Sequence, residues 1–418
     1  LEFRRVLFRS SIKRFALRQD TSRGQLTLDD LLVGETFAEV LSTNPPPAEI
    51  LPTSALSILT YNTHGNFVAD WMTNSPEVQA IGRQVTYLDP DIITFQEIPM
   101  TNSGWAQMTN FVTAFRPGFY LATNSGNDGF IRSCILSRYP ITRSQSWLDS
   151  TDLKPFGYTN TSTTLADNFT RDLFEAEIAV PDFAERLHVF TTHLKSGTSA
   201  ATDAQKRAAE ASAVSNFFVT VFLPGANGAH SYLLTGDLNE DIAQPATGSE
   251  QPIQRLANDA TGLRLTAPRN PTTGSHRTHS IQEVATNQLA NRYDYILPCG
   301  LLFSNYAGSQ VFRSDLLMNP PAPLQTNDTS TASDHLPVMM WFANPYATPF
   351  RILSLDASNS SVTVRWESTS NRVYGIEAAT NLNSWSALAS NVTATGTNTT
   401  FTTNSIAGQR YFRVFRVP

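Results

Sequence analysis

Apolar runs rich in β-branched residues recur through the middle of this 418-residue chain, separated by clusters of turn-forming residues. Several of these runs are apolar at every position, not only at alternate ones. A strand of this kind is buried on both faces, so it requires a second sheet on one side and helices on the other. The runs predict strands at 56–62, 91–96, 131–137, 172–180, 186–193, 231–236, 292–297 and 337–343.

Two segments have the period of an amphipathic helix. In 76–88 and in 202–222, apolar residues recur every three or four positions, so they share one face. Aromatic residues in 102–119 follow the same spacing, which suits a core segment as well as an exposed apolar loop. Strands outnumber helices in the predicted fold.

The composition of the chain and the pattern of its apolar residues change at two places. Residues 1–52 form a lead-in, expected to be partly disordered, with one short helix at 28–41 that ends at a run of prolines. A proline-containing stretch at 344–349 separates the main domain, 53–344, from a module of short alternating strands at 350–418. The alternation predicts a small all-β, sandwich-like module.

Four aromatic residues of this C-terminal module are expected in its core, because large aromatic side chains are more often buried than used as ligand platforms. Carbohydrate or surface binding is the alternative for them. They are Trp366, Tyr374, Trp385 and Tyr411.

Composition limits the class of protein. The net charge is −6, so composition does not indicate the broad basic face that nucleic-acid-binding proteins often carry. This weakens a nuclease interpretation without excluding it, because a divalent metal can supply positive charge locally. No apolar run approaches the ~20 residues that span a bilayer.

Low Lys content with abundant Thr, Ser and Asn suggests a secreted or cell-envelope protein. The first twenty residues nevertheless lack the hydrophobic stretch of a secretory signal. Cys134 and Cys299 could form one disulfide or remain buried thiols, and their strand-like settings favour thiols.

Polar residues stand where several predicted strands end. Asn62 closes the first strand, Glu97 follows 91–96, and His193 closes 186–193. In isolation each has an ordinary explanation: a turn-opening Asn, an exposed carboxylate and a capped structural histidine. Together they offer oxygen ligands and an imidazole, which metal-assisted phosphodiester hydrolysis requires.

The segment 232–241 carries the strongest local signal. Gly236 allows a tight turn after a buried strand, and the two-residue spacing puts Asp237 and Asn239 on one side of an extended segment. They would offer a carboxylate and an amide to one water or metal. An Asx turn is the alternative explanation.

Two further motifs concern a buried acid and an imidazole. Asp294 lies inside an aromatic and aliphatic strand, and a buried carboxylate needs a partner. Asp334 and His335 stand together where a loop enters a strand. Because adjacent residues of an extended strand point to opposite faces, we expect His335 to pair with Asp294 and not with its neighbour.

The order of these motifs resembles the endonuclease/exonuclease/phosphatase superfamily, whose members are similar to deoxyribonuclease I. The resemblance spans roughly residues 55–343. It rests on Thr60-Tyr-Asn62, Gln96-Glu97, Ser137-Arg-Tyr-Pro140, Thr192-His193-Leu-Lys-Ser-Gly197, Gly236-Asp237-Leu-Asn239, Tyr293-Asp294-Tyr-Ile and Ser333-Asp334-His335-Leu-Pro.

The resemblance implies an α+β fold, a four-layer αββα sandwich with its site at one edge of the two sheets, and hydrolysis assisted by Mg²⁺ or Mn²⁺. By motif position, Glu97 would be the main metal ligand, with Asn62 and Asp334 beside it. Some nucleases of the superfamily carry an acidic residue where this chain has His64. That difference leaves the arrangement of a second metal open.

The resemblance also implies roles in proton transfer and phosphate binding. Asp237 and Asn239 would bind or orient the attacking water and a phosphate oxygen. His335, held by Asp294, would take a proton from water or contact the scissile phosphate. His193, on the opposite side of the phosphate, would stabilise its charge or help the leaving group. The general base is either His335 or Asp237.

The leading interpretation is a divalent-metal-dependent phosphodiesterase, an endonuclease that cuts DNA or RNA. A sphingomyelin or phospholipid phosphodiesterase, an inositol-phosphate phosphatase and a catalytically inactive binding protein are the alternatives. We expect a monomer that acts without stable membrane insertion. Arg132 and Arg171 are candidate phosphate contacts, although surface arginines are common.

Overall fold

The computed structural model describes residues 56–65, 71–100, 104–159, 166–183, 185–197, 201–225, 231–244, 251–281, 288–345, 350–358, 361–370, 372–381, 384–404 and 411–416. The lead-in and its expected helix at 28–41 lie outside these residues.

The first sheet has six strands in the order β12-β13-β1-β2-β4-β3. They are β1 (Leu56–Asn62), β2 (Ile92–Pro99), β3 (Tyr120–Thr123), β4 (Ile131–Ser137), β12 (Tyr306–Val311) and β13 (Val338–Phe342). β1 and β2 run parallel, with Asn62 beside Gln96. The parallel register brings the polar ends of these two strands to the same edge of the sheet.

The second sheet has five strands in the order β11-β8-β7-β6-β5. They are β5 (Ile141–Trp147), β6 (Leu173–Ile178), β7 (Leu187–His193), β8 (Ser231–Asp237) and β11 (Asp294–Pro298). The parallel pair β7–β8 sets His193 beside Asp237, and the antiparallel pair β8–β11 sets Asp294 opposite Asp237. Three polar residues are therefore neighbours by register alone.

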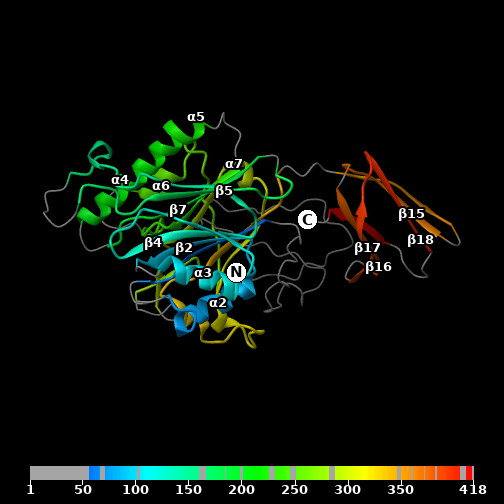
Figure 1. Ribbon diagram of the computed structural model, residues 1–418, viewed down its shortest axis with the longest axis horizontal. Coiled ribbons are helices and arrows are strands. Elements are labelled where there is room, and N and C mark those ends of the chain that lie inside the picture. Colours follow the sequence, from blue (N-terminus) through cyan, green and yellow to red (C-terminus); the bar gives the residue numbers. More distant parts are fainter. Residues whose placement is uncertain are drawn as a thin grey trace, which may run out of the picture. The chain divides into compact units, whose positions relative to one another are not determined.

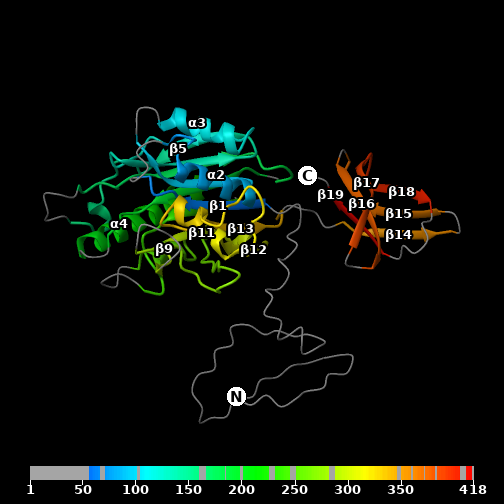
Figure 2. The same ribbon diagram turned by 90° about the horizontal axis from the view of Figure 1, so that it is seen from below.

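The two sheets pack face to face, with helices on both outer faces (Figures 1 and 2). Helices α2 (Pro76–Leu88) and α3 (Gly104–Phe115) cover the first sheet, and α4 (Ala201–Phe217) and α6 (Pro252–Leu256) cover the second. Apolar residues fill the space between the sheets, and the Thr235 hydroxyl also donates to the Thr94 hydroxyl at 2.9 Å. This arrangement confirms the expected four-layer αββα sandwich.

Short elements complete this part of the chain. They are η1 (Lys154–Phe156), the π-helix η2 (Phe218–Phe222), α5 (Leu223–Gly225), α7 (Gly300–Phe303), η3 (Ser314–Leu316), α8 (Asp328–Ala332) and the strand pair β9 (His279–Ser280) and β10 (Leu289–Asn291).

Local sequence explains why α2 has the predicted bounds. The Ser75 hydroxyl accepts the backbone N–H of Val78, and Pro76 occupies the first helical position, where its missing N–H costs nothing. Asp89 ends the helix in a left-handed conformation. The apolar face that includes Ile81 packs against the first sheet.

Other bounds differ from the prediction for identifiable reasons. The helix predicted at 202–222 is α-helical only to Phe217 and then continues as η2. The strands β3, β5 and β12 were not predicted, because edge strands such as β5 are half exposed and lack an apolar run. Strand β2 runs three residues beyond its predicted end at 96, through a bulge.

The C-terminal strands form two three-stranded sheets, β14-β15-β18 and β17-β16-β19, around one apolar core. They are β14 (Ile352–Ala357), β15 (Ser361–Glu367), β16 (Val373–Asn381), β17 (Ser384–Thr393), β18 (Asn398–Asn404) and β19 (Tyr411–Arg416). Trp366 and Tyr374 lie in this core, as predicted. The guanidinium carbon of Arg413 lies 4.4 Å from the ring centroid of Trp385. Tyr411 is 41% exposed, so the prediction that it lies in the core is wrong. The predicted domain bounds stay predictions.

Cys134 and Cys299 are buried free thiols, as expected from their strand-like settings. Within the described part of the chain, no helix is both long and apolar enough to cross a membrane.

Gly236 provides a test of the packing between β7 and β8. Its φ is +136°, and a Cβ built there would lie 1.9 Å from the carbonyl oxygen of Thr192. We expect Gly236→Ala to lower the free energy of unfolding by roughly 2–3 kcal/mol, because backbone atoms must separate. Urea denaturation measures the free energy of unfolding of Gly236→Ala and of the control Gly118→Ala. Gly118 also has a positive φ, +85°, but open space around its Cβ position, so the difference between the two losses reports the close contact at Gly236. Equal losses in both variants would show that strain in φ, not the close approach, sets the cost.

Candidate active site

The polar ends of β1, β2, β7, β8 and β11 meet at one edge of the sandwich, as their registers require. The segment before β13 enters the same edge, where the rings of His279 and His335 lie 4.6 Å apart. The structure therefore brings together residues that the sequence placed on separate strands: Asn62, Glu97, His193, Asp237, Asn239, Asp294, Asp334 and His335.

Asn62 joins the two sheets at this edge. Its side-chain nitrogen donates to Glu97 Oε1 at 3.0 Å and to Asp237 Oδ2 at 2.8 Å. Its side-chain oxygen accepts the backbone N–H of His64 at 3.0 Å. The nitrogen, not the oxygen, faces the carboxylates, so the amide is placed to orient Glu97 and Asp237. The role of metal ligand that the sequence assigned to Asn62 stays a prediction.

Glu97 lies within a bulge and not at the end of its strand, which corrects the sequence interpretation. The register of β2 against β4 shifts between Phe95 and Ile98, and Glu97 has φ +62°. A bulge re-aims a side chain that the regular pleat would point elsewhere. A Cβ on Gly65 would lie 1.6 Å from the Glu97 carbonyl oxygen, so a glycine is needed for this close approach.

His335 and Asp294 form the expected pair. His335 Nδ1 lies 2.8 Å from Asp294 Oδ2, and both side chains are buried. Burial opposes a charge on the ring, but the carboxylates of Asp294 and Asp237 outweigh it and raise the pKa of His335 well above its usual value. The Nε2 atom faces Asp237 Oδ2 at 3.6 Å. An imidazolium is therefore held with one N–H directed into the site.

Asp237 and His193 have the opposite electrostatics. Burial raises the pKa of Asp237 to about 7, partly offset by His335. Burial and the charge of Arg171 hold the pKa of His193 well below its usual value, so His193 is neutral. His193 Nε2 lies 3.4 Å from Asp237 Oδ2 and 3.9 Å from Glu97 Oε1. This edge thus holds a carboxyl that titrates near neutrality beside a neutral imidazole.

Asn239 is not part of an extended segment, which corrects the geometry expected for it. Its φ is +50°, and its backbone N–H donates to Asp237 Oδ1 at 2.8 Å, so the segment is an Asx turn. Its side-chain nitrogen donates to the carbonyl of Leu194 at 3.1 Å. The turn keeps Asn239 close to Asp237 and ties it to the loop that follows His193.

His64 and His279 join the site through Asp334. His64 Nδ1 lies 3.5 Å from Asp334 Oδ1, and His279 Nε2 lies 3.7 Å from Asp334 Oδ2. Burial and the charge of His335 lower the pKa of His279 to about 4. Sequence reasoning did not find His279, because it lies in a turn-rich segment without apolar period and only its residue type could have drawn notice.

The two arginines suggested as phosphate contacts have different surroundings, and Arg171 holds the loop that follows β7. Arg171 donates to the carbonyls of His193 and Leu194 and pairs with Asp128. It is only 6% exposed, so the interpretation as a surface arginine is wrong, while its role as a phosphate contact stays a prediction. Arg132 stacks over the ring of Trp105, with its guanidinium carbon 3.6 Å from the ring centroid.

Arg207 links the two loops that follow β7 and β8. Its guanidinium donates to the carbonyls of Lys195 and Gly197, each at 2.8 Å, and pairs with Glu240 at 3.0 Å. Arg207 is fully buried, so these contacts hold the loops from beneath.

The charge balance of the site fits a divalent cation. Four carboxylates gather there, and within the described ranges their ion-pair partners are histidines alone, with no Lys or Arg. A divalent cation would supply the missing positive charge. The carboxylates are those of Glu97, Asp237, Asp294 and Asp334.

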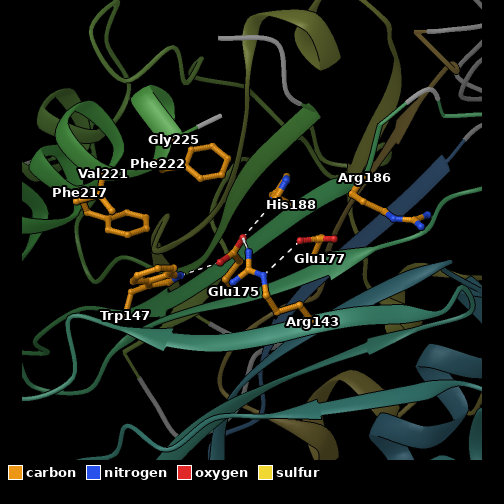
Figure 3. Close-up of a pocket in the computed structure, with 10 residues that line it drawn as sticks. All are labelled: Arg143, Trp147, Glu175, Glu177, Arg186, His188, Phe217, Val221, Phe222 and Gly225. Carbon is orange, nitrogen blue, oxygen red and sulfur yellow. Dashed lines mark hydrogen bonds and ion pairs between the residues drawn. The ribbon is translucent and has the colours of Figure 1, made fainter. Parts of the chain in front are cut away.

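A separate pocket of about 400 Å³ lies on the helix-covered face of the second sheet (Figure 3). Glu175 is buried in its wall, where it accepts hydrogen bonds from Trp147 at 2.7 Å and Arg143 at 2.8 Å and lies 2.7 Å from His188 Nδ1. His188 lies five residues before His193 on β7, so the two histidines face opposite sides of the sheet. None of the candidate active-site residues lines this pocket.

Comparison with solved structures found proteins of low sequence identity. One is an endonuclease/exonuclease/phosphatase family protein from Leptotrichia buccalis C-1013-b, at 14% identity over 69% of this chain and 99% of that chain, with a TM-score of 0.46. Another is D. rerio TDP2 complexed with single strand DNA product, at 16% identity, with the same two coverages and a TM-score of 0.46. A third is sphingomyelinase C from Streptomyces griseocarneus, at 19% identity over 69% of this chain and 100% of that chain, with a TM-score of 0.45. No curated protein sequence matched the chain.

The sequence model of one family matches residues 59–335. This range runs from the middle of β1 to His335 and includes every residue of the site. The chain belongs to the endonuclease/exonuclease/phosphatase family, whose members are hydrolases that act on phosphoester bonds.

Proposed function

We propose that this chain is a divalent-metal-dependent phosphodiesterase. The observation that carries the proposal is the buried His335–Asp294 pair at 2.8 Å, with His335 Nε2 directed toward Asp237. A charged imidazole in this position can bind a phosphate oxygen, and the carboxylate behind it fixes the orientation of the ring. The adjacent carboxyl can then exchange a proton with water.

Glu97 and Asp334 are the proposed ligands of the cation, Mg²⁺ or Mn²⁺. When bound, the cation would offset the charge of the phosphate and polarise its oxygen. Asn62 would orient Glu97 through its amide nitrogen, which donates to Glu97 Oε1 at 3.0 Å.

Asp237 is the proposed general base. Its pKa of about 7 leaves the carboxylate populated near neutrality and still basic enough to accept a proton from water. His335 keeps its proton because Asp294 raises its pKa, so it would bind the phosphate instead of acting as the base. His193, which is neutral, would contact the phosphate or the leaving oxygen through Nε2.

The proposed substrate is DNA or RNA, the polymer named in two of the three activities of the family description. An exposed aromatic ring at the rim is consistent with this. Phe130 is 72% exposed and directly precedes β4, whose first residues pair with β2 just beyond Glu97. Nucleic-acid bases stack on such rings.

A phospholipid is the second candidate substrate, and the same rim favours it. Met100 is 43% exposed, and its N–H donates to the carbonyl of Phe130 at 2.7 Å, so two apolar side chains stand together beside the site. Apolar side chains at a rim can enter a lipid surface.

We further propose, from composition, that the protein acts after export from the cytoplasm.

Removal of the cation or of single site residues should abolish hydrolysis of bis-p-nitrophenyl phosphate. We expect EDTA to stop the reaction, Mg²⁺ or Mn²⁺ to restore it, and His335→Ala or Glu97→Ala to lower kcat/KM by about 10²–10⁴-fold. His276→Ala is the matched control, because His276 bonds the carbonyl of Pro268. Full activity of His335→Ala or Glu97→Ala would refute the roles assigned here.

The pH dependence of kcat/KM should identify the base. Protonated Asp237 cannot accept a proton, so the rate should rise as the pH increases through about 7. Asp237→Asn should remove this rising limb and lower the rate by about 10²–10⁴-fold. A rising limb that persists in Asp237→Asn would place the base elsewhere.

Phe130→Ala should weaken the binding of a nucleic-acid substrate and leave the chemical step unchanged. Loss of a stacked base costs about 1–3 kcal/mol, so KM for single-stranded DNA or RNA should rise about 5–150-fold, while kcat/KM for bis-p-nitrophenyl phosphate stays unchanged. Phe303→Ala serves as control, because Phe303 is also exposed, at 44%, but follows the opposite end of β11. A defect confined to sphingomyelin vesicles would favour the lipid candidate, and no defect on either polymer would exclude Phe130 from binding.

A further inference from the structure

The pocket on the helix-covered face of the second sheet is large enough to hold a small organic molecule. Its volume is about 400 Å³, and pockets that bind such ligands measure roughly 300–1,000 Å³. Strands β5, β6 and β7 form its floor, and the end of α4 with η2 forms a wall (Figure 3). The residues to which the proposed function assigns roles do not line it, so an inference about this pocket does not depend on that function.

Three aromatic rings form one end of the pocket, and a short π-helix brings two of them together. Phe217 and Phe222 are five residues apart, a spacing that a regular α-helix would turn through about 140°. In η2 the N–H of Leu223 donates to the carbonyl of Phe218, the i→i+5 pattern in which five residues complete about one turn. The rings of Phe217 and Phe222 therefore lie on the same side, with centroids 6.5 Å apart and planes at 21°. Trp147 packs against Phe217 with ring centroids 4.9 Å apart.

The floor of the pocket holds two acids whose oxygens already have partners. One oxygen of the buried Glu175 accepts from Trp147, and the other contacts Arg143 and His188. Glu177 uses one oxygen for Arg143 Nε at 3.3 Å and the other for a neighbouring threonine hydroxyl at 2.9 Å. Because every carboxylate oxygen has a donor, neither acid is placed to select a cationic ligand.

Arg186 is the charged residue of the pocket whose charge is not offset. In the part of the chain that the structure describes, its side chain forms no hydrogen bond and no ion pair (Figure 3). It lies two residues before His188, and Glu177 is opposite both His188 and Arg143 in register. Trp147 is four residues beyond Arg143 on β5, a distance of about 13 Å along an extended strand. The pocket therefore has an aromatic end and, at the other end, one positive charge.

We propose that this pocket binds a small organic anion with an aromatic body. The body would lie among the rings of Trp147, Phe217 and Phe222, where burial of apolar surface supplies affinity. The carboxylate, sulfonate or phosphate of the ligand would pair with Arg186, whose planar guanidinium offers several N–H donors to such an oxyanion. The site is distinct from the edge where the polar strand ends meet.

Two dyes that differ only in charge test this inference. Anilinonaphthalene sulfonate has an aromatic body and one anionic group, and phenylnaphthylamine is the same molecule without the sulfonate. Both report binding through their fluorescence. We expect the sulfonate to bind the full-length protein saturably and Arg186→Gln to weaken this binding about tenfold or more, because a charge-assisted hydrogen bond is lost. The affinity for phenylnaphthylamine should be the same in Arg186→Gln as in the wild type.

A second position tests the charge of the ligand with little risk to folding. Val221 lines the pocket and is 48% exposed, so replacing it leaves the core intact. Val221→Glu should weaken sulfonate binding about tenfold through repulsion of like charges, whereas Val221→Lys should not weaken it. Val219→Glu is the matched control, because Val219 lies on the same π-helix and is 39% exposed but does not line the pocket. Circular dichroism checks that each variant is folded.

Three results would overturn the site. They are no saturable binding of the sulfonate to the wild type, an unchanged sulfonate affinity in both folded variants Arg186→Gln and Val221→Glu, and an equal loss of affinity for the neutral dye. None of these measurements involves hydrolysis, so the site can stand if the protein cleaves no phosphodiester and can fail if it does.

Discussion

The amide of Asn62 is the interaction on which the geometry of this site depends. It donates to Glu97 on its own sheet and to Asp237 on the other sheet, so one side chain sets the distance between two carboxylates from different layers. Asn62 can form both hydrogen bonds only if the two sheets pack at the observed separation and register. The apolar contacts between the sheets therefore determine the site as much as its polar residues do.

Backbone strain is concentrated at the same edge. His64, Glu97 and Asn239 all have positive φ, a conformation that costs side-chain-bearing residues about 1 kcal/mol or more each. Each turns a side chain or an N–H toward a neighbour that a regular strand would not reach. Side chains beneath the edge hold the loops in place, among them Arg207, which grips the loop after β7 by its carbonyls. The strain is thus offset by packing away from the site.

The charged residues at this edge and those behind it have different partners. The buried arginines bind backbone carbonyls and acids behind the site, while in the described part of the chain the four site carboxylates pair with histidines. The result is a set of unlike environments within one cluster. His335 is held charged by Asp294, His193 is held neutral by burial, and Asp237 titrates near neutrality. Groups whose pKa values are driven apart in this way can divide acid and base roles between them.

The sequence alone predicted strands buried on both faces and much of the site, and the resemblance carried by its motifs implied the four-layer sandwich. Hydrophobic period is a local property, so helix 76–88, the doubly apolar strands and the polar residues at strand ends, such as Asn62 and Asp237, were readable in the chain. Polar edge strands carry no such signal and were missed. Tertiary structure alone decided the bulge at Glu97 and the meeting of Asp334 with His279. The reason is physical: contacts between segments far apart in the chain depend on how the two sheets pack, and no short stretch of residues encodes that distance.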